Sequence, residues 1–89
     1  MSDLKQSVST STTLKGLSGL SAGARGIVWQ LRGGREFTNR VATLGFTLGA
    51  QVVVVENHGR GPILVELRST RVALGRGEAA KILVQASDE

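Results

Sequence analysis

The sequence holds a single histidine and no cysteine, which narrows the chemistry that its side chains can perform. His58 stands in a glycine-rich loop, and Glu56 lies two positions before it. Alternate residues of an extended chain project to the same side, so this imidazole and carboxylate can face one ion. The pair predicts a weak surface site for Fe2+ or another divalent transition metal, to which a second subunit could add ligands. The alternative is that His58 is a solvated loop histidine without a metal. No cofactor is expected to be required.

Catalysis is not expected of this chain. A nucleophilic mechanism needs Ser or Thr beside a base that is held in place, whereas the one histidine lies among glycines. The glycine pairs Gly23-x-x-Gly26 and Gly59-x-Gly61 lack the lysine and the Ser or Thr of a phosphate-binding loop, and they indicate turns. The lack of cysteine also excludes disulfides, thiolate metal sites and thiol nucleophiles.

The charge balance favours an acidic partner. The net charge of the 89 residues is +4, and eight of the eleven cations are arginine. Nucleic acid, an anionic membrane surface or an acidic protein face would fit, although a solvated basic surface without a specific partner is an alternative. Nucleic acid is disfavoured, because stacking needs exposed aromatic side chains. The three aromatics, Trp29, Phe37 and Phe46, are expected in the core or in the packing at a helix end.

A short helix is the best defined element of the chain. Phe37, Val41 and Leu44 recur at i, i+4 and i+7, which predicts one apolar helix face. Gly45 follows at the place where a left-handed residue ends a helix, and only glycine takes that conformation without strain. Phe46 can then fold back onto the helix.

Five short strands are expected around this helix, at residues 27–31, 52–55, 63–67, 72–74 and 82–84. In the first strand the odd-numbered residues, Ile27, Trp29 and Leu31, are expected to face inward. Arg68 to Arg71 form a tight hairpin connection, and one helical turn is expected around residues 78–80. Five strands with one inserted helix predict a small, strongly bent antiparallel barrel.

The two ends of the chain differ from this pattern. Residues 1–13 are polar and low in complexity, which predicts a disordered tail. A folded domain is expected at residues 14–85, and residues 86–89 are expected to form a short acidic tail. Leu14, Leu17 and Leu20 recur every three residues, which fits either a short helical turn or an irregular segment. No run reaches the roughly 18 apolar residues of a membrane span, and no signal peptide is recognisable, so a cytoplasmic protein is expected.

An ordered series of short motifs carries a resemblance to a known family. It consists of Gly23-x-x-Gly26-Ile27-Val28, Leu44-Gly45-Phe46-x-x-Gly49, Pro62-Ile63-x-Val65, Arg71-Val72-Ala73-Leu74 and Glu78-Ala79-Ala80-Lys81-Ile82-x-Val84. In this order and at these separations the series resembles the ferrous-iron transport protein A (FeoA) family. The sequence departs from the family pattern at Leu48, where proline is frequent, at Ser69, where glycine is usual, and at Gly75, where a basic residue is common.

The resemblance implies a mainly β fold, an SH3-like barrel of about five strands with one short inserted α-helix. It implies an accessory or regulatory protein, not an enzyme, that acts on the cytoplasmic part of the membrane iron transporter FeoB, which carries a GTPase domain. Such a protein would be cytoplasmic, peripheral to the inner membrane through its partner, and free to form a homo-oligomer. The fold is shared with the C-terminal domain of iron-dependent repressors of the DtxR type, so a stand-alone domain of that kind is one alternative. A small basic RNA-binding barrel is another.

The partner-binding surface is predicted at the helix and its exit. Arg35 and Arg40 flank the helix, and Phe46 and Leu48 follow it. An apolar centre ringed by arginine is the composition expected of an interface. The alternative is that Phe46 and Leu48 complete the core beneath the helix end. If Arg40→Glu and Leu48→Asp both bound a partner like the parent, the interface would be expected on the loop at residues 57–61.

Overall fold

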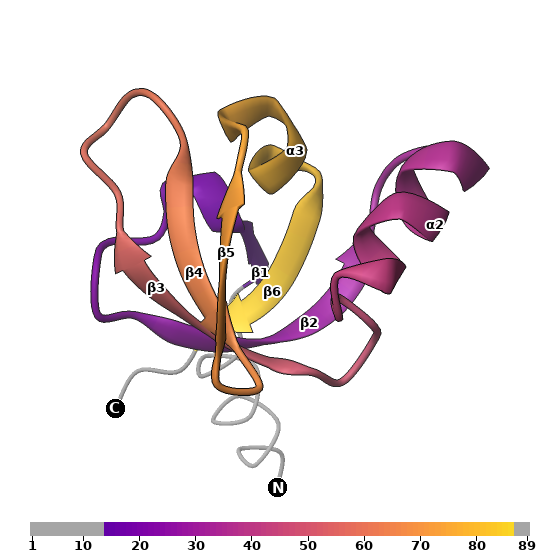
Figure 1. Ribbon diagram of the computed structural model, residues 1–89, viewed down its shortest axis with the longest axis horizontal. Helices are drawn as coiled ribbons and strands as arrows, with labels where there is room; N and C mark the ends of the chain where they lie inside the picture. The colour runs from indigo at the N-terminus through magenta and orange to yellow at the C-terminus, as the bar shows by residue number, and fades with distance from the viewer. Residues whose placement is uncertain (1–13, 87–89) are drawn as a thin grey trace, which may run out of the picture.

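Six antiparallel strands form one strongly curved sheet in the part of the chain that the structure describes, residues 14–86 of a computed structural model (Figure 1). Along the sheet the strand order is β1-β6-β2-β3-β4-β5. The strands are β1 (Leu14–Gly16), β2 (Arg25–Leu31), β3 (Gln51–Glu56), β4 (Ile63–Leu67), β5 (Thr70–Leu74) and β6 (Ile82–Ala86). A 3-10 turn, η1 (Leu17–Gly19), follows β1, and the two α-helices are α2 (Arg35–Thr43) and α3 (Arg76–Ala80). The predicted small, mainly β barrel with one inserted helix is confirmed.

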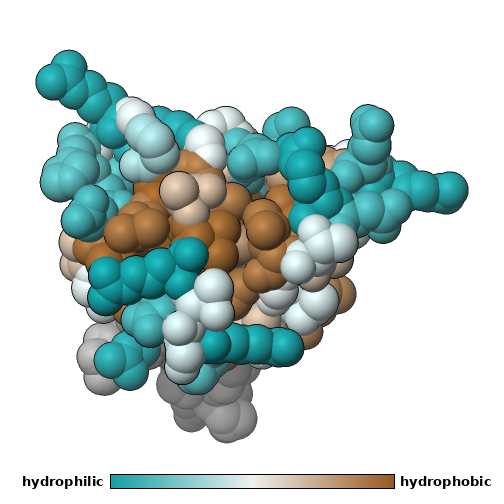
Figure 2. Space-filling view, in the orientation of Figure 1, coloured by the Kyte–Doolittle hydropathy of each residue, from teal (hydrophilic) through white to brown (hydrophobic). Residues whose placement is uncertain are grey.

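The core lies inside the curve of the sheet. In β4 the side chains of Ile63, Val65 and Leu67 are buried and alternate with half-buried neighbours, as the sequence predicted. Val52 and Val54 of β3 are buried in the same way. Figure 2 shows apolar residues gathered near the middle of one face of the molecule, with hydrophilic residues around them.

The predicted orientation of β2 is wrong. Val28 is 1% exposed, whereas Trp29 is 55% exposed and Ile27 is half-buried. The pairing of β2 with β6 shifts between Val28 and Gln30, so two steps along β2 match one step along β6. This β-bulge lets Val28 and Leu31 both contact the core although they are three residues apart. Strict alternation through Ile27, Trp29 and Leu31 therefore placed Trp29 on the wrong side.

Helix α2 ends as the sequence predicted. Gly45 has φ +110°, and its N–H donates to Ala42 O at 2.9 Å. The N–H of Phe46 donates to Val41 O at 3.0 Å, which completes a Schellman motif. The Phe46 side chain is fully buried, as a hydrophobic contact at such a helix end requires.

The predicted apolar face of α2 is correct only in part. Phe37 and Val41 are buried, but Leu44 is 44% exposed. Leu44 is the C-cap residue, beyond the last residue of the helix proper. The chain turns away at Gly45, so Phe46 takes the place in the core that the helical spacing assigned to Leu44.

The hairpin between β4 and β5 is a two-residue turn. Leu67 pairs with Thr70, and Arg68 and Ser69 between them have φ of 55° and 66°. Positive φ at both central residues is the feature of a type I′ turn, which normally takes Asn or Gly. Ser69 therefore adopts a conformation that glycine takes without strain.

The N-terminal leucines belong to two elements. Leu14 begins β1, which pairs with β6 and was not predicted, because three residues give no readable period. Leu17 starts the 3-10 turn and is buried, and Leu20, just after that turn, is 5% exposed. Strand β6 runs to Ala86, one residue past the predicted end of the domain. The tail predicted for residues 1–13 and, apart from Ala86, the tail predicted for residues 86–89 lie outside the described residues. No described helix has the length and apolar composition needed to cross a membrane.

Candidate partner-binding surface

The predicted interface residues are exposed, ion-paired or buried in the structure. Arg35 is exposed on the first turn of α2. Arg40 forms an ion pair with Glu78, which joins α2 to α3. Because the Arg40 side chain is 57% exposed, we expect this ion pair to contribute at most about 1 kcal/mol to stability. Arg40 is thus engaged by Glu78 within the molecule, and its contact with a partner stays a prediction.

Phe46 is not part of any partner-binding surface in this fold. Its side chain is 0% exposed, because it closes the core beneath the end of α2. The alternative stated for Phe46 is therefore the correct one. Leu48 differs, since its side chain is 67% exposed and does not complete the core.

Leu48 lies beside the exposed tryptophan of β2. A shallow hollow is lined by Ile27, Val28, Trp29, Leu48 and Gly49. Two backbone hydrogen bonds hold its walls together: the N–H of Gly49 donates to Val28 O, and the N–H of Val28 donates to Ala50 O, both at 2.8 Å. The connection from α2 to β3 is thus fixed against β2.

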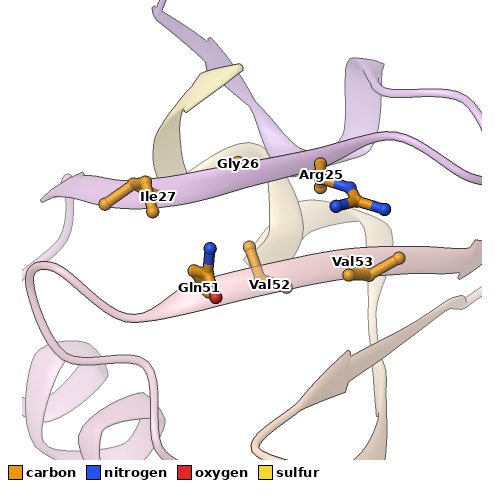
Figure 3. A pocket seen from close by; sticks show the side chains of 6 residues that line it. All are labelled: Arg25, Gly26, Ile27, Gln51, Val52 and Val53. Carbon is orange, nitrogen blue, oxygen red and sulfur yellow. The ribbon is translucent and has the colours of Figure 1, made fainter. Parts of the chain in front are cut away.

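A second hollow lies farther along β2, between β2 and β3, and shares Ile27 with the first. It is lined by Arg25, Gly26, Ile27, Gln51, Val52 and Val53 (Figure 3). Arg25 pairs with Val53 in the sheet, and Ile27 pairs with Gln51. Their side chains are exposed or half-buried, in contrast to the buried Gly26 and Val52 between them. We call the surface formed by Arg25, Ile27, Trp29, Leu48, Gln51 and Val53 the outer β2–β3 face.

The sequence did not reveal this face. Trp29 was assigned to the core because the bulge in β2 leaves no mark in the pattern of apolar residues. The stated reason against nucleic acid was that the aromatics are not exposed, and it does not hold for Trp29. Leu48 was the one sequence signal for this face, because it is an apolar residue in a turn and does not fit the periodic pattern of core residues.

The two predicted metal ligands lie close together at the end of β3. His58 Nε2 and Glu56 Oε1 are 3.6 Å apart, and the two side chains are 75% and 58% exposed. Among the described residues no group of three or more His, Asp or Glu side chains is placed to hold an ion. A site with these two ligands stays a prediction.

Asn57, between them in sequence, has a structural role that the sequence did not indicate. Its Nδ2 donates to Leu20 O at 2.7 Å and to Ser18 O at 3.1 Å. Its Oδ1 accepts from Arg76 Nη2 at 2.7 Å and from the N–H of Gly59 at 3.0 Å. The half-buried Asn57 thus joins the β3–β4 loop to η1 and α3. Only the short-range contact to Gly59 has a sequence signal, the Asn-x-Gly turn.

The sequence matches a known protein family. The profile of the FeoA domain matches residues 15–86. A protein of Methanocaldococcus jannaschii, described as a candidate Fe(2+) transport protein A, is 30% identical over 59 residues, which cover 66% of this chain and 71% of that protein.

Solved structures of similar fold include FeoA proteins and a repressor. An iron uptake regulatory protein (FeoA) matches with a TM-score of 0.80 and 32% identity, over 83% of this chain and 99% of that one. FeoA of Stenotrophomonas maltophilia in complex with zinc, described as an SH3 domain protein, matches with a TM-score of 0.64 and 31% identity, over 78% and 87% of the two chains. A manganese-dependent transcriptional repressor matches with a TM-score of 0.74 and 25% identity, over 82% of this chain but 41% of the repressor.

Proposed function

Because the chain belongs to the FeoA domain family, we propose that it is an accessory protein of ferrous-iron uptake that binds the cytoplasmic part of a FeoB-type GTPase-permease. The observation that carries the proposal is the extent of the family match, which covers β1 to β6 and so takes in the whole barrel. The activity would lie in binding and regulation, and we assign no catalytic residue. The protein would work in the cytoplasm and reach the inner membrane through its partner.

The exposed apolar side chains of the outer β2–β3 face support a binding role. Trp29 and Leu48 are more than half exposed and lie on the rim of the same hollow. Tryptophan is among the residues most enriched at the energetic centres of protein interfaces. A barrel that acted only as an inert spacer would not need these side chains on its surface.

The direct test is a binding measurement with purified proteins. The cytoplasmic domain of the FeoB-type protein from the same genome is immobilised, and an unrelated GTPase domain serves as the control surface. We expect this chain to be retained by the first domain and not by the second. Equal retention on both surfaces, or none on either at micromolar concentration, would contradict the proposed function.

A weak metal site at Glu56 and His58 is the second part of the proposal. Iron is then cargo of the transporter and not a resident cofactor of this chain. Two exposed ligands leave most of the coordination sphere to water, so we expect affinity for Fe2+ or Zn2+ weaker than micromolar. The zinc complex of the Stenotrophomonas maltophilia protein supports a test of both ions.

Calorimetry of the parent, His58→Ala and Glu56→Gln proteins with each ion measures this site. The heat of binding should fall to the dilution level in both variants. A submicromolar site with one ion per chain that survives His58→Ala would show that metal binds elsewhere.

A second candidate function comes from the repressor match. The barrel is similar to about two fifths of a manganese-dependent repressor, so the chain could act as a stand-alone relative of the C-terminal domain in DtxR-type repressors. Such a domain would bind to a DNA-binding protein or to a metal-sensing dimer, not to a permease. Retention by the FeoB domain in the binding test distinguishes the two functions.

A further inference from the structure

We propose that the outer β2–β3 face is the partner-binding site and that it takes an acidic segment of protein with one large apolar side chain. The apolar side chain would lie between Trp29 and Leu48, and a carboxylate would pair with Arg25. This inference rests on the proposed function, because it takes the partner from the FeoB-type transporter. It places the site on strands β2 and β3 and on the connection that leads from α2 into β3.

The first argument is the distribution of exposed apolar side chains. Among residues 14–86, the large apolar side chains that are strongly exposed are Leu14, Trp29, Leu44 and Leu48. Trp29 and Leu48 line one hollow, and its remaining wall is Ile27, Val28 and Gly49. Leu14 and Leu44 line neither hollow of this face. A concave apolar surface with an aromatic wall suits an inserted side chain better than a flat contact does.

The second argument is that the site is already formed. The bulge at Trp29 and the paired backbone bonds between Val28 and residues 49 and 50 fix the two walls relative to each other. Gly49 has φ +91°, so the tight turn beside Leu48 depends on glycine, which also leaves the hollow open at that point. A preformed site loses little conformational entropy when a partner binds.

The third argument is charge. Figure 3 shows Arg25 and Ile27 on β2 opposite Val53 and Gln51 on β3, with the guanidinium at one end of the hollow. Within the described chain the ion pairs are those of Arg40 with Glu78 and His58 with Glu56, so Arg25 is left for an external carboxylate. An unpaired arginine beside an apolar hollow selects a segment that carries both an acidic and an apolar group.

The same residues favour protein over nucleic acid. A single-stranded nucleic acid needs cations that follow its backbone across several nucleotides. Here one arginine stands beside Ile27, Leu48 and Val53, which are aliphatic. Trp29 alone could stack on a base, so nucleic acid is retained as an outcome of the test.

The experiment uses Trp29 as a reporter, since it is the only tryptophan of the chain. The full-length protein is labelled with 5-fluorotryptophan, and its single fluorine resonance is followed by NMR during titration with the FeoB cytoplasmic domain. The same titration is repeated with a single-stranded oligonucleotide and with unlabelled protein of this chain. We expect the resonance to shift with the FeoB domain only. A shift with the oligonucleotide only, or with the second copy only, would assign the face to that ligand and overturn the proposal.

Matched variants then test the residues by calorimetry against the FeoB domain. Leu48→Asp and Arg25→Glu should each weaken binding about tenfold or more, because they place a charge in the apolar hollow or reverse the charge that pairs with the partner. Leu44→Asp and Arg71→Glu carry the same changes at exposed positions outside this face, and they should bind like the parent. Circular dichroism confirms that all four variants are folded.

The experiments distinguish a failure of the proposed binding face from a failure of the proposed function. If the parent binds the FeoB domain while Leu48→Asp and Arg25→Glu bind equally well and the resonance does not move, the face is wrong and the proposed function stands. If the parent does not bind the FeoB domain, the proposed function falls and the inference falls with it.

Discussion

At the scale of single residues, Gly45 and Ser69 are two of the positions with positive φ at which the chain turns. Gly45 ends α2 in a left-handed conformation, and Ser69 adopts a similar one without being glycine. The sequence predicted the first from the position of Gly45 after the last turn of the helix. It left the turn at Ser69 undecided, because a serine carries no sign of positive φ.

We expect Gly45→Val to lower stability by about 1–3 kcal/mol or more, because a β-branched residue is strained at φ +110°. The added Cβ would also lie 2.7 Å from Leu67 Cδ2, so the core must shift. The melting temperature of a domain this small should fall by about 4 °C or more.

Gly49→Val is the control for Gly45→Val. Its φ of +91° is equally unsuited to valine, but a Cβ there meets nothing within 4 Å. Thermal denaturation should therefore rank the proteins as parent, Gly49→Val and Gly45→Val in decreasing stability. Equal melting temperatures for the parent and Gly45→Val would disprove the role given to Gly45.

Ser69→Gly is expected to stabilise the protein by up to about 1 kcal/mol, since glycine removes the strain of φ 66° in the turn. Ser69→Ala keeps a Cβ at the same φ and should not raise stability. Urea unfolding curves of the three proteins measure the difference. A gain for Ser69→Ala equal to that for Ser69→Gly would mean that backbone strain is not the cause.

At the scale of elements, the sequence predicted features that follow a regular pattern of apolar residues and missed a feature that interrupts such a pattern. The alternation in β4 and the glycine after α2 could be read directly, and both are confirmed. The bulge in β2 could not be read, because it depends on pairing with β6 some fifty residues later. The candidate site lies at that bulge, so Trp29 and Arg25 were missed while Leu48 was found.

The loop that carries Glu56 and His58 is held by Asn57. Asn57→Ala removes two donors to backbone carbonyls and an acceptor for Arg76, which is half-buried. We expect a loss of about 1–3 kcal/mol and faster hydrogen exchange at η1 and α3. Asn39→Ala, on the exposed side of α2, is the control and should leave both unchanged. Unchanged exchange rates in Asn57→Ala would show that the loop is held by other contacts.

At the scale of the whole molecule, the fold does not determine the function. The same barrel occurs in FeoA proteins and in part of a transcriptional repressor, so the surface must decide what the chain binds. The sequence predicted the barrel and a basic protein-binding role. It placed the interface on α2 and its exit, from Arg35 to Leu48. Within that stretch Phe46 is buried and Arg40 is paired, because solvent exposure depends on packing that a single sequence does not display.

The central claim is that the chain supports ferrous-iron uptake through the outer β2–β3 face. It is tested most directly by measuring uptake of radioactive Fe2+ in cells that lack this gene and are complemented with the parent, Leu48→Asp or Leu44→Asp at equal protein levels. Our account predicts full uptake with the parent and Leu44→Asp, and uptake near that of the deletion strain with Leu48→Asp. Full uptake with Leu48→Asp, or no difference between the deletion strain and the parent, would contradict it.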